Sequence, residues 1–291
     1  MDHAQKFDRV NGALCKLREK GKSILFASNN SIPSGQALVD KIQRMTGYSC
    51  SPADNFSVNP VIRHTLEKCL DKEKNESVYL MASQGLEEEL DAHDINHFGN
   101  GPDATPASYE LNDISAITLA DNVRVVLIGQ DEHFNFMKLV KAASYLKRRD
   151  PSDGDWACHF LATSWETGYE FTPGRVQPIA GSLAQCIAAC AGREPTYVGK
   201  PGPLIFETMK EKVPGFDPAR VCMIGDSLKS DVGFAKTNGI ASLAVLSGVT
   251  SLETMKTYQA DETSRHCGMP LRSLLPDYFV GSIVELADML D

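Results

Sequence analysis

The stretch that decides the fold is residues 221–240, which read VCMIGDSLKSDVGFAKTNGI. A short apolar run ends at Gly225 and Asp226, a second carboxylate follows at Asp231, and a helical pattern then runs to a glycine. In a parallel sheet, a strand of this kind delivers its carboxylate to the carboxyl edge, where such folds bind their ligands. The stretch therefore predicts an α/β fold and one half of a metal site.

Short apolar runs and amphipathic helical patterns alternate along the rest of the chain. The predicted strands are 23–27, 78–82, 123–128, 159–163, 221–224 and 241–246. The predicted helices are 7–19, 35–45, 61–70, 134–146, 183–191, 204–212 and 232–238. This alternation is typical of an α/β fold with a mostly parallel sheet.

Two loop-like segments interrupt the alternation, at 96–106 (NHFGNGPDATP) and 149–155 (RDPSDGD). We therefore predict that residues 85–191 form an inserted domain with its own small sheet. The two parts of the core would then be residues 1–84 and 192–291.

Composition narrows the classes of function. The chain has 291 residues and a net charge of −9, and no Lys/Arg-rich block occurs, so nucleic acid is not an expected partner. The eight cysteines are scattered and form no Cys-x-x-Cys, which indicates free thiols in a reducing compartment. No signal peptide or long apolar span is found, so we expect a cytoplasmic protein that does not bind membranes.

Polar side chains follow the first apolar run. Ser28, Asn29 and Asn30 come directly after residues 23–27. Together with the backbone N–H groups that open the next helix, they would form a neutral anion-binding loop. The alternative is an ordinary turn and helix cap.

A lysine is fixed between glycine and proline in the segment Gly199-Lys200-Pro201. Such a lysine can reach a phosphoryl oxygen and offset its charge. The alternative for Lys200 is a solvated loop residue. For Asp226 and Asp231, the alternative is a helix cap followed by a solvated carboxylate.

The three motifs, which contain Ser28–Asn30, Lys200, and Asp226 with Asp231, occur in a fixed order, and together they indicate a family more strongly than any one of them does. The segments FASNNS (26–31), VGKPGPLIFE (198–207) and MIGDSLKSDVGFAKTNGI (223–240) resemble three motifs of the haloacid-dehalogenase-like phosphatases. The chain is most similar to the branch that contains phosphoglycolate phosphatase and pyridoxal phosphatase. Further similar segments are LIGQDEHFNFMKL (127–139), AGSLAQCIAACAGREP (180–195), LSGVTSLE (246–253) and LPDYFVGSIVELADML (275–290).

The resemblance implies a Rossmann-like core and an inserted α/β cap. In that family an Asp nucleophile attacks phosphorus to form an aspartyl-phosphate, a second Asp acts as acid and base, and Mg²⁺ neutralises charge. The matched motifs imply that Ser28, Asn29 and Asn30 hold the phosphate. Lys200 would stabilise the charge of the phosphate, and Asp226 would bind Mg²⁺. Asp231 would support the metal shell or orient Lys200.

The cap loop at 162–175 should contact the substrate. Family members often show Thr-Asn-x-Asp there, whereas this chain has Thr163-Ser164-Trp165-Glu166. Tyr169 lies about where some relatives place a substrate-contacting residue, and its alternative role is a surface aromatic. The resemblance favours 2-phosphoglycolate or pyridoxal 5′-phosphate as substrate, with a phosphoprotein left open, and a homodimer formed through the cap.

The family's first motif, Asp-x-Asp-Gly-Val at the end of the first core strand, has no match in this chain. Only six residues precede the predicted helix at 7–19, so neither Asp2 nor Asp8 has a strand to present it. The pair Asp153 and Asp155 lies in a polar loop and is expected to form a turn. We expect the first core strand to be missing between the strands at 23–27 and 221–224.

Loss of a central parallel strand leaves two facing rows of unpaired backbone groups. Each buried unpaired group costs about 1–3 kcal/mol, against a typical total stability of about 5–15 kcal/mol. We therefore expect residues 1–291 to be poorly folded, rearranged, or completed by another strand. Three hypotheses remain: a Mg²⁺-dependent phosphatase given without its first strand, an inactive relative that binds a partner or a phosphorylated ligand, and a structural α/β protein.

Overall fold

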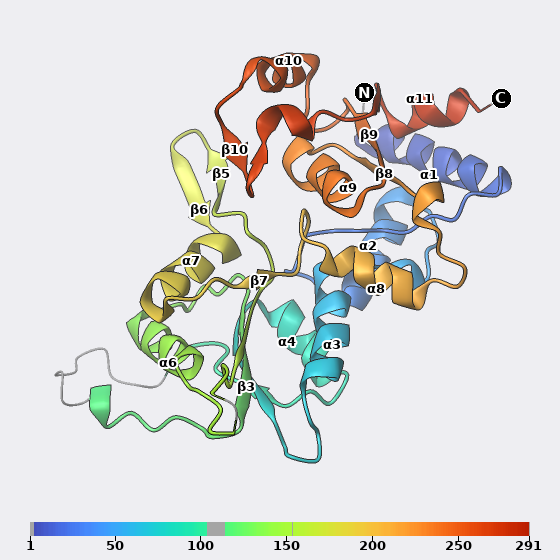
Figure 1. Ribbon diagram of the computed structural model, residues 1–291. Helices are drawn as coiled ribbons and strands as arrows, with labels where there is room; N and C mark the ends of the chain where they lie inside the picture. Colours follow the sequence, from blue (N-terminus) through green and yellow to red (C-terminus); the bar gives the residue numbers. More distant parts are fainter. Residues whose placement is uncertain (1–2, 104–113, 153, 291) are drawn as a thin grey trace. The chain divides into compact units, whose positions relative to one another are not determined.

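The computed structural model describes residues 3–103, 114–152 and 154–290 (Figure 1). The chain divides into two compact units. Unit 1 comprises residues 1–28, 36–56 and 200–291, and unit 2 comprises residues 29–35 and 57–199.

Unit 2 is built on a five-stranded parallel sheet in the order β2-β1-β3-β4-β7. Its strands are β1 (Ser77–Met81), β2 (His97–Phe98), β3 (Val123–Ile128), β4 (His159–Ala162) and β7 (Thr196–Tyr197). All five residues of β1 are buried, as expected for a parallel strand covered on both faces.

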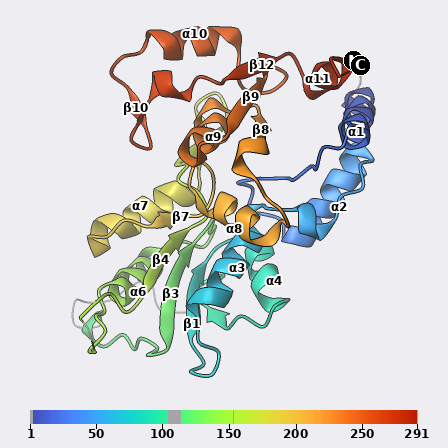
Figure 2. The same cartoon turned by 45° about the vertical axis from the view of Figure 1, so that its right-hand side comes forward.

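Helices cover both faces of this sheet. They are α3 (Val58–Cys69), α4 (Gln84–Asp91), α6 (Phe136–Leu146) and α7 (Ala180–Ala191). Figures 1 and 2 show α6 and α7 on one face and α3 and α4 on the other. A separate antiparallel hairpin, β5 (Gly168–Thr172) and β6 (Arg175–Pro178), is exposed along almost its whole length.

Unit 1 contains a three-stranded parallel sheet in the order β12-β9-β8. Its strands are β8 (Cys222–Gly225), β9 (Ala241–Val245) and β12 (Tyr278–Val280). Its helices are α1 (His3–Glu19), α2 (Gly35–Thr46), α8 (Leu204–Lys212), α9 (Gly233–Asn238), α10 (Leu252–Ala260) and α11 (Ile283–Asp288). A short hairpin of β10 (Arg265–His266) and β11 (Met269–Pro270) completes the unit.

The expected α/β class is confirmed, but the strand predicted at 23–27 is wrong. That segment forms one isolated parallel bridge, between Phe26 and Asn55. The Phe26 N–H donates to Asp54 O, and Phe26 O accepts from Phe56 N, both at 2.8 Å. Within the described residues no strand lies on the second edge of β8, so the segment lacks the neighbour that would extend a ladder.

Unit 2 is larger than the insert predicted at 85–191. The strand at 77–81, which we expected in the core, pairs with β3 in unit 2. In the predicted loop at 96–106, residues 97–98 form β2, and residues 104–106 lie outside the described residues. Residues 149–155 are a loop, as expected, apart from residue 153, which is also outside them.

Candidate functional site

The end of β8 turns sharply into the helix that follows it. Ser227 begins a π-helical turn at Leu228–Val232, and its hydroxyl accepts from Ser230 N at 3.2 Å. Asp231 lies in this turn, with its carboxylate directly against Gly225. A Cβ at Gly225 would overlap that carboxylate, so the glycine is what allows Asp231 to lie under the end of β8.

Lys200 and Asp231 form a buried ion pair at this strand end. The Lys200 Nζ lies 2.6 Å from Asp231 Oδ1, and the two residues are only 6% and 5% exposed. The same ammonium donates to Ala27 O at 2.8 Å, and Asp231 Oδ2 accepts from Ser227 N at 3.0 Å. Asp231 therefore fixes the position of Lys200, and Lys200 is not a solvated loop lysine.

Asp226 is held by the loop that follows β9. Its Oδ2 accepts from Val249 N at 3.0 Å, and its backbone carbonyl accepts from Thr250 Oγ1 at 2.6 Å. Gly248 packs against the Asp226 side chain and has no room for a Cβ. The sequence analysis placed these three loop residues in the similar segment 246–253 but assigned them no role. Their place after β9, at the same sheet edge as Asp226, is the signal that could have identified them.

Few side chains near the end of β8 could act as ligands for a metal ion. The described residues contain no group of three or more His, Cys, Asp or Glu side chains placed to hold an ion. Asp231 accepts hydrogen bonds from Lys200 and Ser227, whereas within the described residues one of the two carboxylate oxygens of Asp226 accepts from a backbone N–H. Mg²⁺ takes one or two protein carboxylates and completes its shell with water and phosphate, so Asp226 fits the role of a single ligand.

The predicted phosphate loop is divided between the two units. Ser28 is half-buried at the end of the first segment of unit 1, and Asn29 and Asn30 belong to unit 2. The Asn30 Oδ1 accepts from Ile32 N at 3.1 Å, as in the turn that we had kept as the alternative.

Asn29 lies against the backbone of Gly199 in unit 2. A Cβ at Gly199 would come within 2.8 Å of Asn29 Oδ1 and 2.7 Å of Thr163 O. The Gly199 N–H donates to Thr163 O at 3.0 Å. Thr163 is fully buried, and its hydroxyl makes no hydrogen bond within the described part of the chain. The structure thus brings together Asn29, Gly199 and a polar group of the drifted cap motif.

Asn59, on α3, holds the segment that follows Asn30. This fully buried side chain donates from Nδ2 to Ser31 O at 3.1 Å and to Pro33 O at 2.8 Å. Ser83 Oγ also donates to Ser31 O, at 2.7 Å. Asn59 was not identified from the sequence, because nothing in the local pattern of α3 shows what its side chain contacts.

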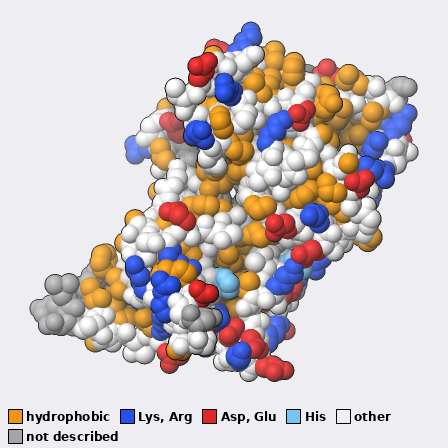
Figure 3. All heavy atoms as spheres, viewed as in Figure 1, with side chains coloured by type: hydrophobic (Ala, Val, Ile, Leu, Met, Phe, Trp, Pro, Cys, Tyr) orange, Lys and Arg blue, Asp and Glu red, His pale blue; other side chains and the backbone are white. Residues whose placement is uncertain are grey.

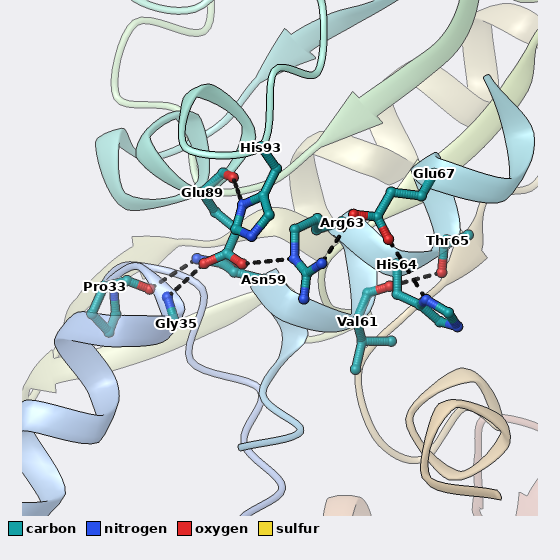
Figure 4. Close-up of polar contacts among 10 residues, drawn as sticks. All are labelled: Pro33, Gly35, Asn59, Val61, Arg63, His64, Thr65, Glu67, Glu89 and His93. Carbon is teal, nitrogen blue, oxygen red and sulfur yellow. Dashed lines mark hydrogen bonds and ion pairs between the residues drawn. The ribbon is translucent and has the colours of Figure 1, made fainter. Parts of the chain in front are cut away.

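Glu89, on α4, holds the start of α2 in the same way (Figure 4). Its carboxylate accepts from Gly35 N at 2.9 Å and from Arg63 Nε at 3.2 Å. Arg63 also pairs with Glu67 at 3.0 Å. The loop 31–35 is therefore fixed from both α3 and α4 within unit 2.

Tyr169 is not brought together with these residues. It lies on β5, is 61% exposed, and makes an edge contact with Phe171 at 6.2 Å between ring centroids. In the predicted cap loop, Ser164 Oγ accepts from Glu166 N at 3.1 Å, which closes a local turn. The expected substrate contact at Tyr169 stays a prediction.

Parallel α/β folds bind their ligands at the carboxyl edge of the sheet, and the Lys200–Asp231 pair lies at such an edge, at the end of β8. The family model described as haloacid dehalogenase-like hydrolase matches residues 1–96, and a HAD-hydrolase-like model matches residues 197–266. Glycerol-3-phosphate phosphatase of Gallus gallus is 31% identical over 96% of this chain and 85% of its own length. Chronophin of Bos taurus is 32% identical over 95% and 84%. The chain belongs to the haloacid dehalogenase-like hydrolase family.

Solved structures agree on the fold. The p-nitrophenyl phosphatase from Archaeoglobus fulgidus superposes with a TM-score of 0.72 at 22% identity, covering 97% of this chain and 91% of that one. The family models and the two relatives confirm the resemblance read from the three motifs. No helix in the described part of the chain has the length and apolarity needed to cross a membrane.

Charged side chains of both signs are mixed on the surface. On the face shown in Figure 3, Lys and Arg side chains lie among acidic and apolar ones and do not form one continuous basic stripe. The expectation that nucleic acid is not a partner stays a prediction.

Proposed function

We propose that this chain is a Mg²⁺-dependent phosphomonoesterase for small phosphorylated metabolites, of the 2-phosphoglycolate or pyridoxal 5′-phosphate type. The observation that carries the proposal is the buried pair of Lys200 and Asp231 at the end of β8. A fixed ammonium in a site of low dielectric stabilises developing phosphoryl charge far more than a solvated one does. The phosphatase names of the relatives support the same reaction class.

Each residue has a distinct task in this proposal. Lys200 binds a phosphoryl oxygen, and Asp231 keeps its ammonium in place. Ser28, Asn29 and Asn30 bind the remaining phosphate oxygens through amide, hydroxyl and backbone donors. Tyr169 contacts the organic part of the substrate.

Asp226 would hold the metal ion. When bound, Mg²⁺ neutralises phosphate charge and orients the ester. The role of this chain is to keep Asp226 in place: the N–H of Val249 donates to its carboxylate, and the hydroxyl of Thr250 donates to its backbone carbonyl.

The nucleophile is the part of the reaction that residues 1–291 do not supply by motif. Asp155 lies in a loop of unit 2, and no Asp-x-Asp follows a strand of unit 1 in the described residues. This observation favours a second candidate function, an inactive relative that binds a partner or a phosphorylated ligand through the same lysine and asparagines.

One experiment separates the two functions. Release of phosphate from 2-phosphoglycolate, pyridoxal 5′-phosphate, glycerol 3-phosphate and 4-nitrophenyl phosphate is measured with and without Mg²⁺, and binding of inorganic phosphate is measured by calorimetry. Turnover that disappears in Lys200→Ala supports the enzyme. Binding without turnover supports the inactive relative.

The matched control is Lys236→Ala. Lys236 also pairs with an aspartate at 2.6 Å, but on the surface of unit 1, so its loss should leave both turnover and phosphate binding unchanged. If Lys200→Ala turns over substrate and binds phosphate as the parent does, both candidates are wrong. A cytoplasmic location and a homodimer through the cap complete the proposal, and sedimentation velocity tests the dimer.

A further inference from the structure

Trp156, in the loop before β4, lies between two arginines of unit 2. It is 38% exposed. The Arg149 Cζ lies 3.3 Å from the centroid of its ring, and the Arg193 Cζ lies 4.3 Å from it. Two guanidinium groups this close to one ring would overlap if they shared a face, so they lie on opposite faces. The two cations are therefore separated by roughly the sum of these two distances.

Neither guanidinium is neutralised by a carboxylate within the described residues. Arg149 Nη1 donates to Gly154 O at 3.2 Å, and Arg193 Nη1 donates to Leu146 O at 2.9 Å. The ion pairs of the neighbouring arginines involve other side chains. Burial, with a smaller contribution from Arg149, lowers the pKa of Arg193. The positive charge of Arg193 is thus disfavoured in this place as long as no anion is near.

The acidic side chain next to Arg149 in the sequence has other partners. Asp150 Oδ1 accepts from Ser152 N at 2.9 Å and from Ser152 Oγ at 2.6 Å. The other oxygen of this carboxylate lies 3.7 Å from Arg124 Nη1. Asp150 therefore pairs with Arg124 and not with Arg149.

A third cation lies beside the two arginines. Lys147, at the end of α6, is exposed, and its Nζ lies 3.5 Å from where a Cβ at Gly192 would be, one residue before Arg193. Figure 3 shows Lys and Arg side chains gathered over α6. The carboxyl ends of α6 and α7 supply about half a negative charge each. About two positive charges of this basic cluster of Lys147, Arg149 and Arg193 are thus left without compensation.

The basic cluster lies at the amino edge of the unit 2 sheet. Trp156 comes before β4, and Arg193 comes before β7. Thr163 and Gly199, which lie against Asn29, follow the same two strands at the carboxyl edge. The basic cluster is therefore at the opposite end of this sheet from Asn29, and its occupancy does not depend on phosphatase activity.

We propose that the basic cluster is a binding site for a diphosphate group. Each guanidinium has five N–H donors and uses one of them on a backbone carbonyl, so each can still bind phosphate oxygens through two parallel hydrogen bonds. Because the two guanidinium groups lie on opposite faces of Trp156, each would bind its own phosphoryl group. Lys147 would add a point charge beside Arg193.

The test uses the whole chain and methylenediphosphonate, a diphosphate analogue with carbon in place of the bridging oxygen, which a phosphatase cannot hydrolyse. Binding is read from the emission of Trp156 and from the heat in calorimetry. Trp165→Phe leaves Trp156 as the single tryptophan of the chain. Ionic strength is held constant with chloride, because salt screens exposed charges.

We expect a saturable change in Trp156 emission. Arg149→Gln should weaken binding about tenfold, because it removes charge-assisted hydrogen bonds. The matched control is Arg18→Gln, which makes the same change in charge and removes a guanidinium from the ring of Tyr48 in unit 1, and it should leave the affinity unchanged. Arg193→Gln should also weaken binding, and thermal unfolding checks that this variant keeps α6, whose last carbonyl Arg193 caps.

Further ligands and one further variant locate the site. Orthophosphate should change Trp156 emission only at about tenfold higher concentration or more, since it offers one phosphoryl group to two guanidinium groups. Tighter binding of ADP than of methylenediphosphonate would name a nucleoside diphosphate as the ligand, and equal binding would name the diphosphate group alone. Lys200→Ala should keep the emission change, so this site and the proposed phosphate site can fail separately.

Three results would overturn the proposal. The first is unchanged Trp156 emission, with the same calorimetric heat in the parent and in Arg149→Gln, at millimolar methylenediphosphonate. The second is equal weakening by Arg149→Gln and Arg18→Gln, which would indicate attraction by the overall charge of the protein. The third is equal affinity for orthophosphate and methylenediphosphonate.

Discussion

At the residue scale, the buried ion pair of Lys200 and Asp231 should contribute to the stability of the fold as well as to the proposed phosphate binding. Removing one partner of a buried ion pair leaves an uncompensated charge. We expect Lys200→Met to lower the free energy of unfolding by about 3–5 kcal/mol, measured by urea denaturation.

The paired control for this prediction is again on the surface. Lys236→Met breaks an ion pair of the same length with Asp277, and should cost less than about 1 kcal/mol because solvent screens that pair. The double variant Lys200→Met with Asp231→Asn should recover part of the loss. Equal effects of the two lysine substitutions would contradict the assignment of a buried pair.

Substitution of Gly248 is expected to destabilise the protein, because the Asp226 side chain packs against this glycine. A methyl group there would overlap the carboxylate, so Gly248→Ala should cost about 1–3 kcal/mol of stability. Gly12, within α1, has no atom within 4 Å of its would-be Cβ. Gly12→Ala should therefore stabilise the protein by about 0.5–1 kcal/mol. Thermal unfolding of both variants checks the contrast, and equal shifts would contradict it.

His266 should make stability depend on pH. It is buried on β10, and burial, with a smaller contribution from Lys229, lowers its pKa to about 4. The unfolded chain binds this proton near the ordinary pKa of about 6.5. Stability is therefore full above pH 6.5 and falls as the pH drops toward 4, by about 2–3 kcal/mol.

The measurement for His266 is urea denaturation at pH 7 and at pH 4.5. His266→Asn lacks the titrating group, so its stability should fall less over the same interval. Parallel pH profiles for the parent and the variant would show that other groups cause the loss.

At the scale of elements, α3 and α4 fix the loop that leads into α2. Asn59→Ala would remove the buried donor from the carbonyl of Pro33 and one of the two donors, with Ser83 Oγ, from the carbonyl of Ser31. We expect a loss of about 2–3 kcal/mol in stability and weaker binding of inorganic phosphate, read by calorimetry. Thr65→Ala on the same helix is the control, because its hydroxyl donates to Val61 O within α3 and to no other group in the described part of the chain. Unchanged phosphate binding in Asn59→Ala would separate this loop from the site.

Helices and strands were predicted well where the hydrophobic pattern of the segment matched the packing that the segment has in the structure. The strand at 123–128 and the helix at 204–212 match β3 and α8 residue for residue. The segment 23–27 has an equally strong apolar pattern and forms no strand, because a strand needs a hydrogen-bonded neighbour that a sequence pattern cannot supply. The Lys200, Asp226 and Asp231 positions were also predictable, since they follow from motifs at strand ends.

At the scale of the whole molecule, the two sheets should differ in protection from solvent. β3 lies inside a complete five-stranded sheet, and β8 lies at the edge of its sheet. We expect backbone amides of β3 to exchange with deuterium only on global unfolding, and those of β8 to exchange through local opening. Equal protection of the two strands would contradict the position of β8 at the edge of its sheet.

The sequence by itself determined the alternation of strands and helices, the family, and the residues at the strand ends, because these depend on periodicity and on short motifs. The tertiary structure decided that Asp231 positions Lys200, that the loop after β9 holds Asp226, and that Asn59 and Glu89 fix the asparagine loop. It also decided which apolar segment became a strand. These outcomes depend on partners distant in sequence, whose approach is set by packing of the whole unit and is invisible in any local pattern.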